Sequence, residues 1–86
     1  MPEISRFYGI LIKMYFNDHQ PPHFRAEYGN YELLISIDAL AVIAGKFPPR
    51  AMGMVIEWAS LHQRDRKRAW NQARSFEIVE KIEPLR

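Results

Sequence analysis

Hydrophobic and polar residues alternate along the first part of the chain. Between residues 7 and 16, one side is apolar and consists of Ile10, Ile12, Met14 and Phe16. The other side carries Leu11, Lys13 and Tyr15. A period of two with many β-branched and aromatic residues is typical of a β-strand. The pattern predicts a first strand over residues 7–16, followed by a turn over residues 17–22, where Asn, Asp and Pro are concentrated.

A second alternating segment is centred on Gly29-Asn30, two residues that tolerate positive φ and therefore suit a two-residue hairpin turn. Residues 23–28 and 31–37 would form its strands. Pairing Tyr28 with Tyr31 places the apolar residues on one face and the polar ones on the other. The apolar face would contain Phe24, Ala26, Leu33 and Ile35, and the polar face His23, Arg25, Glu27 and Glu32.

The pattern becomes helical in the second half of the chain. A turn at Asp38-Ala39 precedes a short strand over residues 40–44, and Pro49 suits the first turn of a helix over residues 50–63. Residues 64–74 predict a second helix or a bent continuation, and residues 75–82 an edge strand. We therefore expect an α+β fold, with an antiparallel sheet of four to five strands and one or two C-terminal helices packed on it, forming a single domain over residues 1–86.

Composition narrows the function classes. The chain has 86 residues, no cysteine and a net charge of +2, so thiolate chemistry and disulfides are excluded. It shows no signal peptide and no apolar window long enough to span a membrane, which predicts a cytoplasmic protein with no membrane partner. The sequence contains no P-loop, dinucleotide fingerprint or Ser-His-Asp arrangement, and we predict no cofactor.

The polar face of the predicted hairpin is the strongest candidate site. His23, Arg25 and Glu27 are residue types that serve acid–base catalysis or anion binding, and Lys13 and Tyr15 of the first strand could assist them. The register sets Glu27 opposite Glu32, which like-charge repulsion disfavours unless a cation, either Arg25 or Lys13, lies between the two carboxylates. The alternative is the ordinary wet face of a half-exposed antiparallel sheet.

The loop before this hairpin contains Asp18 and His19, four residues from His23. Imidazole and carboxylate groups both suit zinc. However, Pro21 and Pro22 prevent a helix that would bring the two histidines onto one face, and only two histidines are close. We therefore predict no metal site, and interpret Asp18 and His19 as a polar loop.

Two further patterns lie in the helical half. Five basic residues against one acidic residue lie between residues 62 and 74, and Arg64, Lys67 and Arg68 are candidates for contact with nucleic acid or a protein. A solvated helix face is the alternative, and Trp70 belongs to the apolar stripe and is expected in the core. The preceding helix has a wide apolar surface, formed by Met52, Met54, Trp58 and Leu61. This surface is either part of the core or an exposed patch that binds a partner or a second copy of the chain.

Several stretches of the chain resemble the small bacterial family catalogued as domain of unknown function 4160. They are residues 2–9, 15–24, 46–51, 57–62 and 81–85. The resemblance implies no established activity. It implies a gene context beside a second small protein, in an arrangement that suggests a toxin–antitoxin pair. Arg25 stands where the family often has histidine, and the helix after His62 is basic where the family is acidic or mixed.

Two functional hypotheses follow. In the first, the chain is a toxin–antitoxin-type component that acts through protein–protein interaction with the small protein of a neighbouring gene, with a homodimer as an alternative assembly. In the second, it is a metal-independent ribonuclease-like toxin that cleaves RNA with His23, Arg25 and Glu27.

Overall fold

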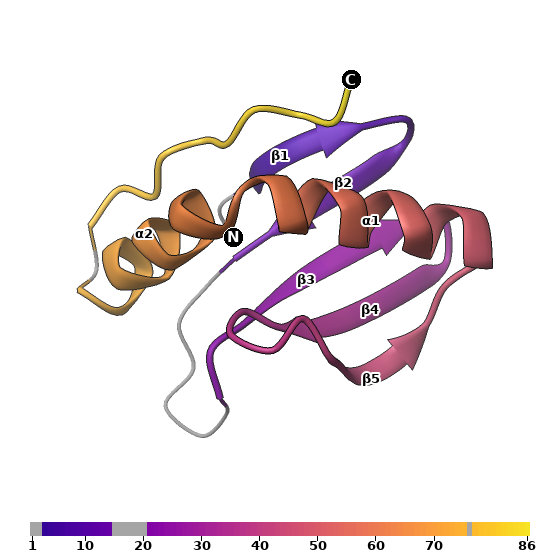
Figure 1. The fold of residues 1–86 in the computed structure, drawn as a ribbon, viewed down its shortest axis with the longest axis horizontal. Coiled ribbons are helices and arrows are strands. Elements are labelled where there is room, and N and C mark those ends of the chain that lie inside the picture. The colour runs from indigo at the N-terminus through magenta and orange to yellow at the C-terminus, as the bar shows by residue number, and fades with distance from the viewer. Residues whose placement is uncertain (1–2, 15–20, 76) are drawn as a thin grey trace.

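The computed structural model describes residues 3–14, 21–75 and 77–86, and shows five strands followed by two helices (Figure 1). The strands are β1 (Glu3–Phe7), β2 (Ile10–Lys13), β3 (His23–Tyr28), β4 (Tyr31–Ser36) and β5 (Val42–Lys46). The helices are α1 (Pro49–Leu61) and α2 (Gln63–Arg74). The strands form one antiparallel sheet in the order β1-β2-β3-β4-β5. The predicted α+β fold is confirmed.

The core lies between α1 and the sheet face that α1 crosses (Figure 1). Trp58 of α1 is fully buried, with its ring 5.8 Å from Phe24 of β3 and 5.7 Å from Phe7 of β1. The opposite face of the sheet carries partly exposed residues, among them Leu11, Arg25 and Glu27. The helices therefore leave this second sheet face accessible.

The central hairpin has the predicted register. Tyr28 pairs with Tyr31, and Phe24 pairs with Ile35. Gly29 has a φ of 57°, as a turn of the primed type requires. The Gly29-Asn30 signal and the alternation of apolar residues were thus sufficient to fix this part of the sheet.

The prediction of one strand over residues 7–16 is wrong. Tyr8 and Gly9 have φ values of 49° and 80°, so they form a two-residue turn between β1 and β2, and Phe7 pairs with Ile10 across it. A tyrosine at positive φ gives no turn signal in the sequence, which is why the alternation looked continuous. Residues 15 and 16 of the predicted strand, and residues 17–20 of the turn that follows, lie outside the described residues.

The fourth predicted strand lies two residues later than expected, at Val42–Lys46. Leu40 has a φ of 53° and lies in the connection between the turn and β5, while Gly45 remains in the strand with a φ of 97°. A Cβ at Gly45 would lie 2.2 Å from the carbonyl oxygen of Glu32. Glycine therefore permits a close approach of β4 and β5 here and does not end the strand.

The predicted edge strand over residues 75–82 is also wrong, since residues 77–86 contain no strand. This tail runs beside β1, where the Ile82 amide donates to the Ile4 carbonyl at 2.7 Å. Further along, the Trp58 indole Nε1 donates to the Glu83 carbonyl at 2.8 Å. A buried Ile82 side chain and the Trp58 hydrogen bond therefore hold the tail in place of a ladder of backbone hydrogen bonds.

Of the two alternatives for residues 64–74, a second helix or a bent continuation of the first, the structure shows a second helix. Pro49 occupies the first turn of α1, where its missing N–H is harmless. His62, with φ −123° and ψ 40°, separates α1 from α2. The Arg66 guanidinium of α2 bridges this break, because its Nε donates to the Ala59 carbonyl at 2.8 Å and its Nη1 donates to the Ile37 carbonyl. Arg66 thus fastens both helices to the end of β4.

Candidate functional site

The predicted polar face of the hairpin is a ladder of alternating charges. Lys13 Nζ lies 3.1 Å from Glu27 Oε1, and Arg25 Nη1 lies 3.8 Å from Glu27 Oε2 and 3.5 Å from Glu32 Oε1. The expected cation between Glu27 and Glu32 is therefore present, and it is Arg25. Because each of these charges has a partner of opposite sign, the ladder offers a locally compensated surface.

His23, unlike the partly exposed residues of this ladder, is buried. Only 2% of the residue is exposed, and its ring centroid lies 6.2 Å from that of Trp70 in α2. Its Nδ1 lies 2.9 Å from the Pro21 carbonyl oxygen, which can only accept, so Nδ1 carries the hydrogen. The structure thus brings Arg25 and Glu27 together and places His23 in the packing between the sheet and α2.

The other residues predicted around this face can be placed only in part. Lys13 contacts Glu27, as described above, whereas Tyr15, Asp18 and His19 lie outside the described residues. Within residues 3–14, 21–75 and 77–86, no group of three or more His, Cys, Asp or Glu side chains is placed to hold a metal ion.

The basic run of α2 divides into three environments. Arg68 lies 3.6 Å from Asp65 and 3.9 Å from Glu80, so two carboxylates offset its charge. Lys67 lines a hollow together with Arg74. Arg64 is exposed and does not line that hollow.

Arg66 is the member of this run whose role the sequence analysis missed. It is only 2% exposed, and burial lowers the pKa of its guanidinium, while the nearby Asp38 carboxylate raises that pKa. A signal was available, since Arg66 precedes Ala69, Trp70 and Ala73 by three, four and seven residues. This spacing puts Arg66 on the buried stripe of α2.

The wide apolar surface of α1 is mostly core. Trp58 is fully buried, and Met52 and Met54 are partly buried against the core cluster. Leu61 is 67% exposed at the end of the helix. Most of the predicted patch is therefore used inside the fold.

A cluster of exposed aromatic residues lies at the hairpin turns, and the sequence analysis did not single it out. Tyr8, Tyr28 and Tyr31 are 61%, 38% and 49% exposed. The two turns are neighbours, because a Cβ at Gly9 would lie 3.4 Å from Cε1 of Tyr28. Gly9 and Gly29 both line one pocket between them. A tyrosine at a positive φ could have been recognised only by knowing that residues 8 and 9 form a turn.

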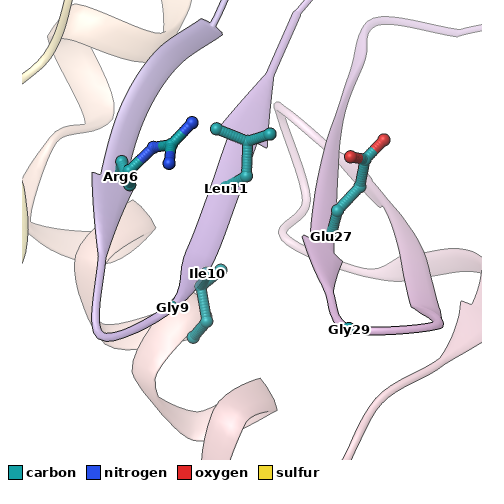
Figure 2. A pocket seen from close by; sticks show the side chains of 6 residues that line it. All are labelled: Arg6, Gly9, Ile10, Leu11, Glu27 and Gly29. Atoms are coloured by element: carbon teal, nitrogen blue, oxygen red, sulfur yellow. The ribbon is translucent and has the colours of Figure 1, made fainter.

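The pocket has a volume of about 240 Å³ and lies between β1, β2 and β3 (Figure 2). Leu11 of β2 lies between Arg6 of β1 and Glu27 of β3, so an apolar side chain is flanked by charges of opposite sign. We call the three tyrosines and this pocket the tyrosine surface. None of the described tyrosines lines the pocket itself, and the Tyr28 ring packs against Phe47, with ring centroids 6.2 Å apart. The tyrosines lie at the hairpin turns beside the pocket, and exposed tyrosines near a concave patch with charged groups are features of protein-binding surfaces.

Fold and site together define a small α+β protein with a meander sheet, two C-terminal helices and an aromatic surface at the hairpin turns. In the described part of the chain, neither helix has the length and apolar character needed to cross a membrane. The family described as Domain of unknown function (DUF4160) matches residues 9–71, and the chain belongs to that family. No curated protein and no solved structure matches the chain.

Proposed function

We propose that this chain is a toxin–antitoxin-type component that acts by binding the small protein of a neighbouring gene, and that it binds this partner through the tyrosine surface. The conformation of Tyr8 carries the proposal. This residue has a φ of 49° and is 61% exposed. A strained backbone conformation lowers stability, and such conformations are concentrated at functional sites. A large, exposed aromatic residue in this conformation therefore points to a role in binding.

The two-residue turn between β1 and β2 requires the positive φ of Tyr8, but it does not require a tyrosine. The left-handed region is about 1–2 kcal/mol less favourable for a residue with a Cβ, and asparagine or glycine occupies it more readily. Leu40 also has a positive φ, of 53°, but its side chain is partly buried against the core, and this burial stabilises the fold. Tyr8 makes no comparable buried contact, so its side chain is available to a partner.

The rest of the tyrosine surface supports a protein ligand. Tyrosine is enriched among the residues that dominate binding energy in protein interfaces, since it supplies a large contact area with few rotatable bonds. The partner segment would place an apolar side chain on Leu11 and polar groups toward two ion pairs of opposite orientation, Arg6 with Glu3 at 2.9 Å and Glu27 with Lys13 at 3.1 Å. The opposite signs of Arg6 and Glu27 would fix the direction of that segment.

The geometry favours binding over the ribonuclease hypothesis. An acid–base pair must reach the reacting atoms of its substrate, but His23 is 2% exposed. Arg25, the residue that would stabilise a developing negative charge, already lies near the carboxylates of Glu27 and Glu32.

The proposal is tested by co-expressing the chain with the small protein of the neighbouring gene and measuring their affinity by calorimetry. We expect a stable complex, and we expect Tyr8→Asn to weaken it by at least tenfold, the effect of losing a residue worth more than about 1.4 kcal/mol. Ile78→Asn is the matched control, since it removes an apolar side chain that is 92% exposed outside the surface.

Three outcomes would contradict the proposal. Two proteins that elute separately would exclude the neighbouring partner. Equal weakening by both variants would exclude the tyrosine surface as the binding site. A homodimer that Tyr8→Asn dissociates, measured by sedimentation, would make the occupant a second copy of the chain.

A further inference from the structure

A second hollow, of about 290 Å³, lies between α2 and the segments that flank the start of β3 and the end of β4. Lys67, Asn71 and Arg74 line one side of it, and Asp38 and Pro22 line the other. Pro22 and Tyr28 bound the two ends of β3, so this hollow is about 20 Å from the tyrosine surface at 3.3 Å per residue. The two sites can therefore act separately.

The cations of this hollow are unpaired in the described part of the chain. Neither Lys67 nor Arg74 has a carboxylate within ion-pair distance there, although Arg68 on the same helix has two. Lys67, Asn71 and Arg74 follow the spacing i, i+4, i+7, which places them on one face of α2. An exposed row of two cations and an amide beside a hollow is suited to a negatively charged ligand.

We infer that this hollow binds single-stranded RNA. Lys67 and Arg74 begin about 10 Å apart along the helix axis, at 1.5 Å per residue, so a ligand with repeated phosphates can contact both. The Asp38 carboxylate would repel a bare anion, but it accepts a hydrogen bond from a hydroxyl group. The 2′-hydroxyl of a ribose is such a donor, and it distinguishes RNA from DNA. Pro22 supplies an apolar wall beside these polar groups.

The experiment measures binding of a fluorescein-labelled twelve-nucleotide single-stranded uridine RNA and of its 2′-deoxy counterpart, by anisotropy at about 0.1 M salt. We expect the RNA to bind more tightly than the DNA. Each phosphate contact on a single strand contributes about 0.7 to the slope of log K against log salt. Lys67→Gln and Arg74→Gln should therefore each weaken binding about fivefold at this salt concentration and reduce the slope by about 0.7.

Arg64→Gln is the matched control, because it removes the same charge from an exposed position of α2 outside the hollow. It should change the affinity less than twofold. Asp38→Asn removes the anion repulsion, and we expect it to tighten DNA binding while lowering the preference for RNA. Tyr8→Asn should leave RNA binding unchanged, which separates this inference from the proposed function.

The inference would be overturned by absence of RNA binding at micromolar protein, or by equal effects of Arg64→Gln and Lys67→Gln. Equal affinity for the RNA and the 2′-deoxy strand would overturn the assignment to RNA. Competition by oligoglutamate at the same charge concentration as the RNA would show that the hollow takes acidic peptides instead.

Discussion

Arg66 offers the most direct test of how the helices are attached to the sheet. Its guanidinium donates to the carbonyls of Ala59 and Ile37, and the residue is 2% exposed. Replacement by methionine keeps much of the side-chain volume and removes both hydrogen bonds. Arg68, two residues along the same helix, is the matched control. Its side chain is 59% exposed, and it lies in ion pairs of 3.6 Å with Asp65 and 3.9 Å with Glu80.

The magnitude follows from the two carbonyls that Arg66→Met leaves behind. The Ala59 carbonyl still accepts a hydrogen bond from the His62 amide at 3.2 Å, so it keeps one partner after the substitution. The Ile37 carbonyl belongs to a residue that is 1% exposed, and a buried acceptor without a partner costs about 1–3 kcal/mol. Removing a buried charge offsets part of the total. We expect Arg66→Met to lower the free energy of unfolding by about 2 kcal/mol, and Arg68→Met to change it by less than about 0.5 kcal/mol.

Urea unfolding followed by tryptophan fluorescence measures both variants. Trp58 and Trp70 are 0% and 8% exposed, so both report the loss of the core. A change of 2 kcal/mol corresponds to a fall in Tm of about 8–16 °C for a domain of this size. Equal stabilities of the Arg66 and Arg68 variants would refute the assignment of Arg66 as the fastening residue.

Three further substitutions test other parts of the fold. Gly45→Ala should destabilise the chain by more than Gly29→Ala, since a Cβ would lie 2.2 Å from a backbone oxygen at Gly45 and meets nothing within 4 Å at Gly29; equal Tm values would contradict this. Trp58→Phe removes the hydrogen bond to the Glu83 carbonyl, so trypsin should cleave after Lys81 faster than in the wild type, and an unchanged cleavage rate would show that the tail is held otherwise. Arg25→Met leaves two glutamates facing each other and should lower stability by about 1 kcal/mol, with part of the loss recovered in 0.5 M salt; a loss insensitive to salt would point to packing.

The parts of the fold that the sequence predicted are those fixed by local signals. Gly29-Asn30 and the alternation around it determined the register of β3 and β4, and Pro49 located the start of α1. Local signals failed where tertiary contacts decide. Tyr8 occupies a turn that its residue type disfavours, and the tail beside β1 is β-rich in composition but is held by contacts from Trp58 and Ile82.

For the candidate site, the sequence predicted the contacts that strand pairing fixes and missed those that depend on helix packing. The register correctly set Glu27 opposite Glu32, because strand pairing fixes which side chains face each other, but it left open whether Arg25 or Lys13 lies between them. It did not show that α2 buries His23, since that depends on the packing of a helix some forty residues away in the sequence. The tyrosine surface brings together two turns, and only the pairing of β2 with β3 makes them neighbours.

The paired effect of Tyr8→Asn on stability and on partner binding tests the central claim most directly. Because asparagine relieves the left-handed strain, the account predicts a gain of about 1 kcal/mol, or about 4–8 °C in Tm. The same variant should bind the neighbouring small protein at least tenfold more weakly. A variant that is more stable and binds the partner as tightly as the wild type would contradict the claim that Tyr8 is strained for the sake of binding.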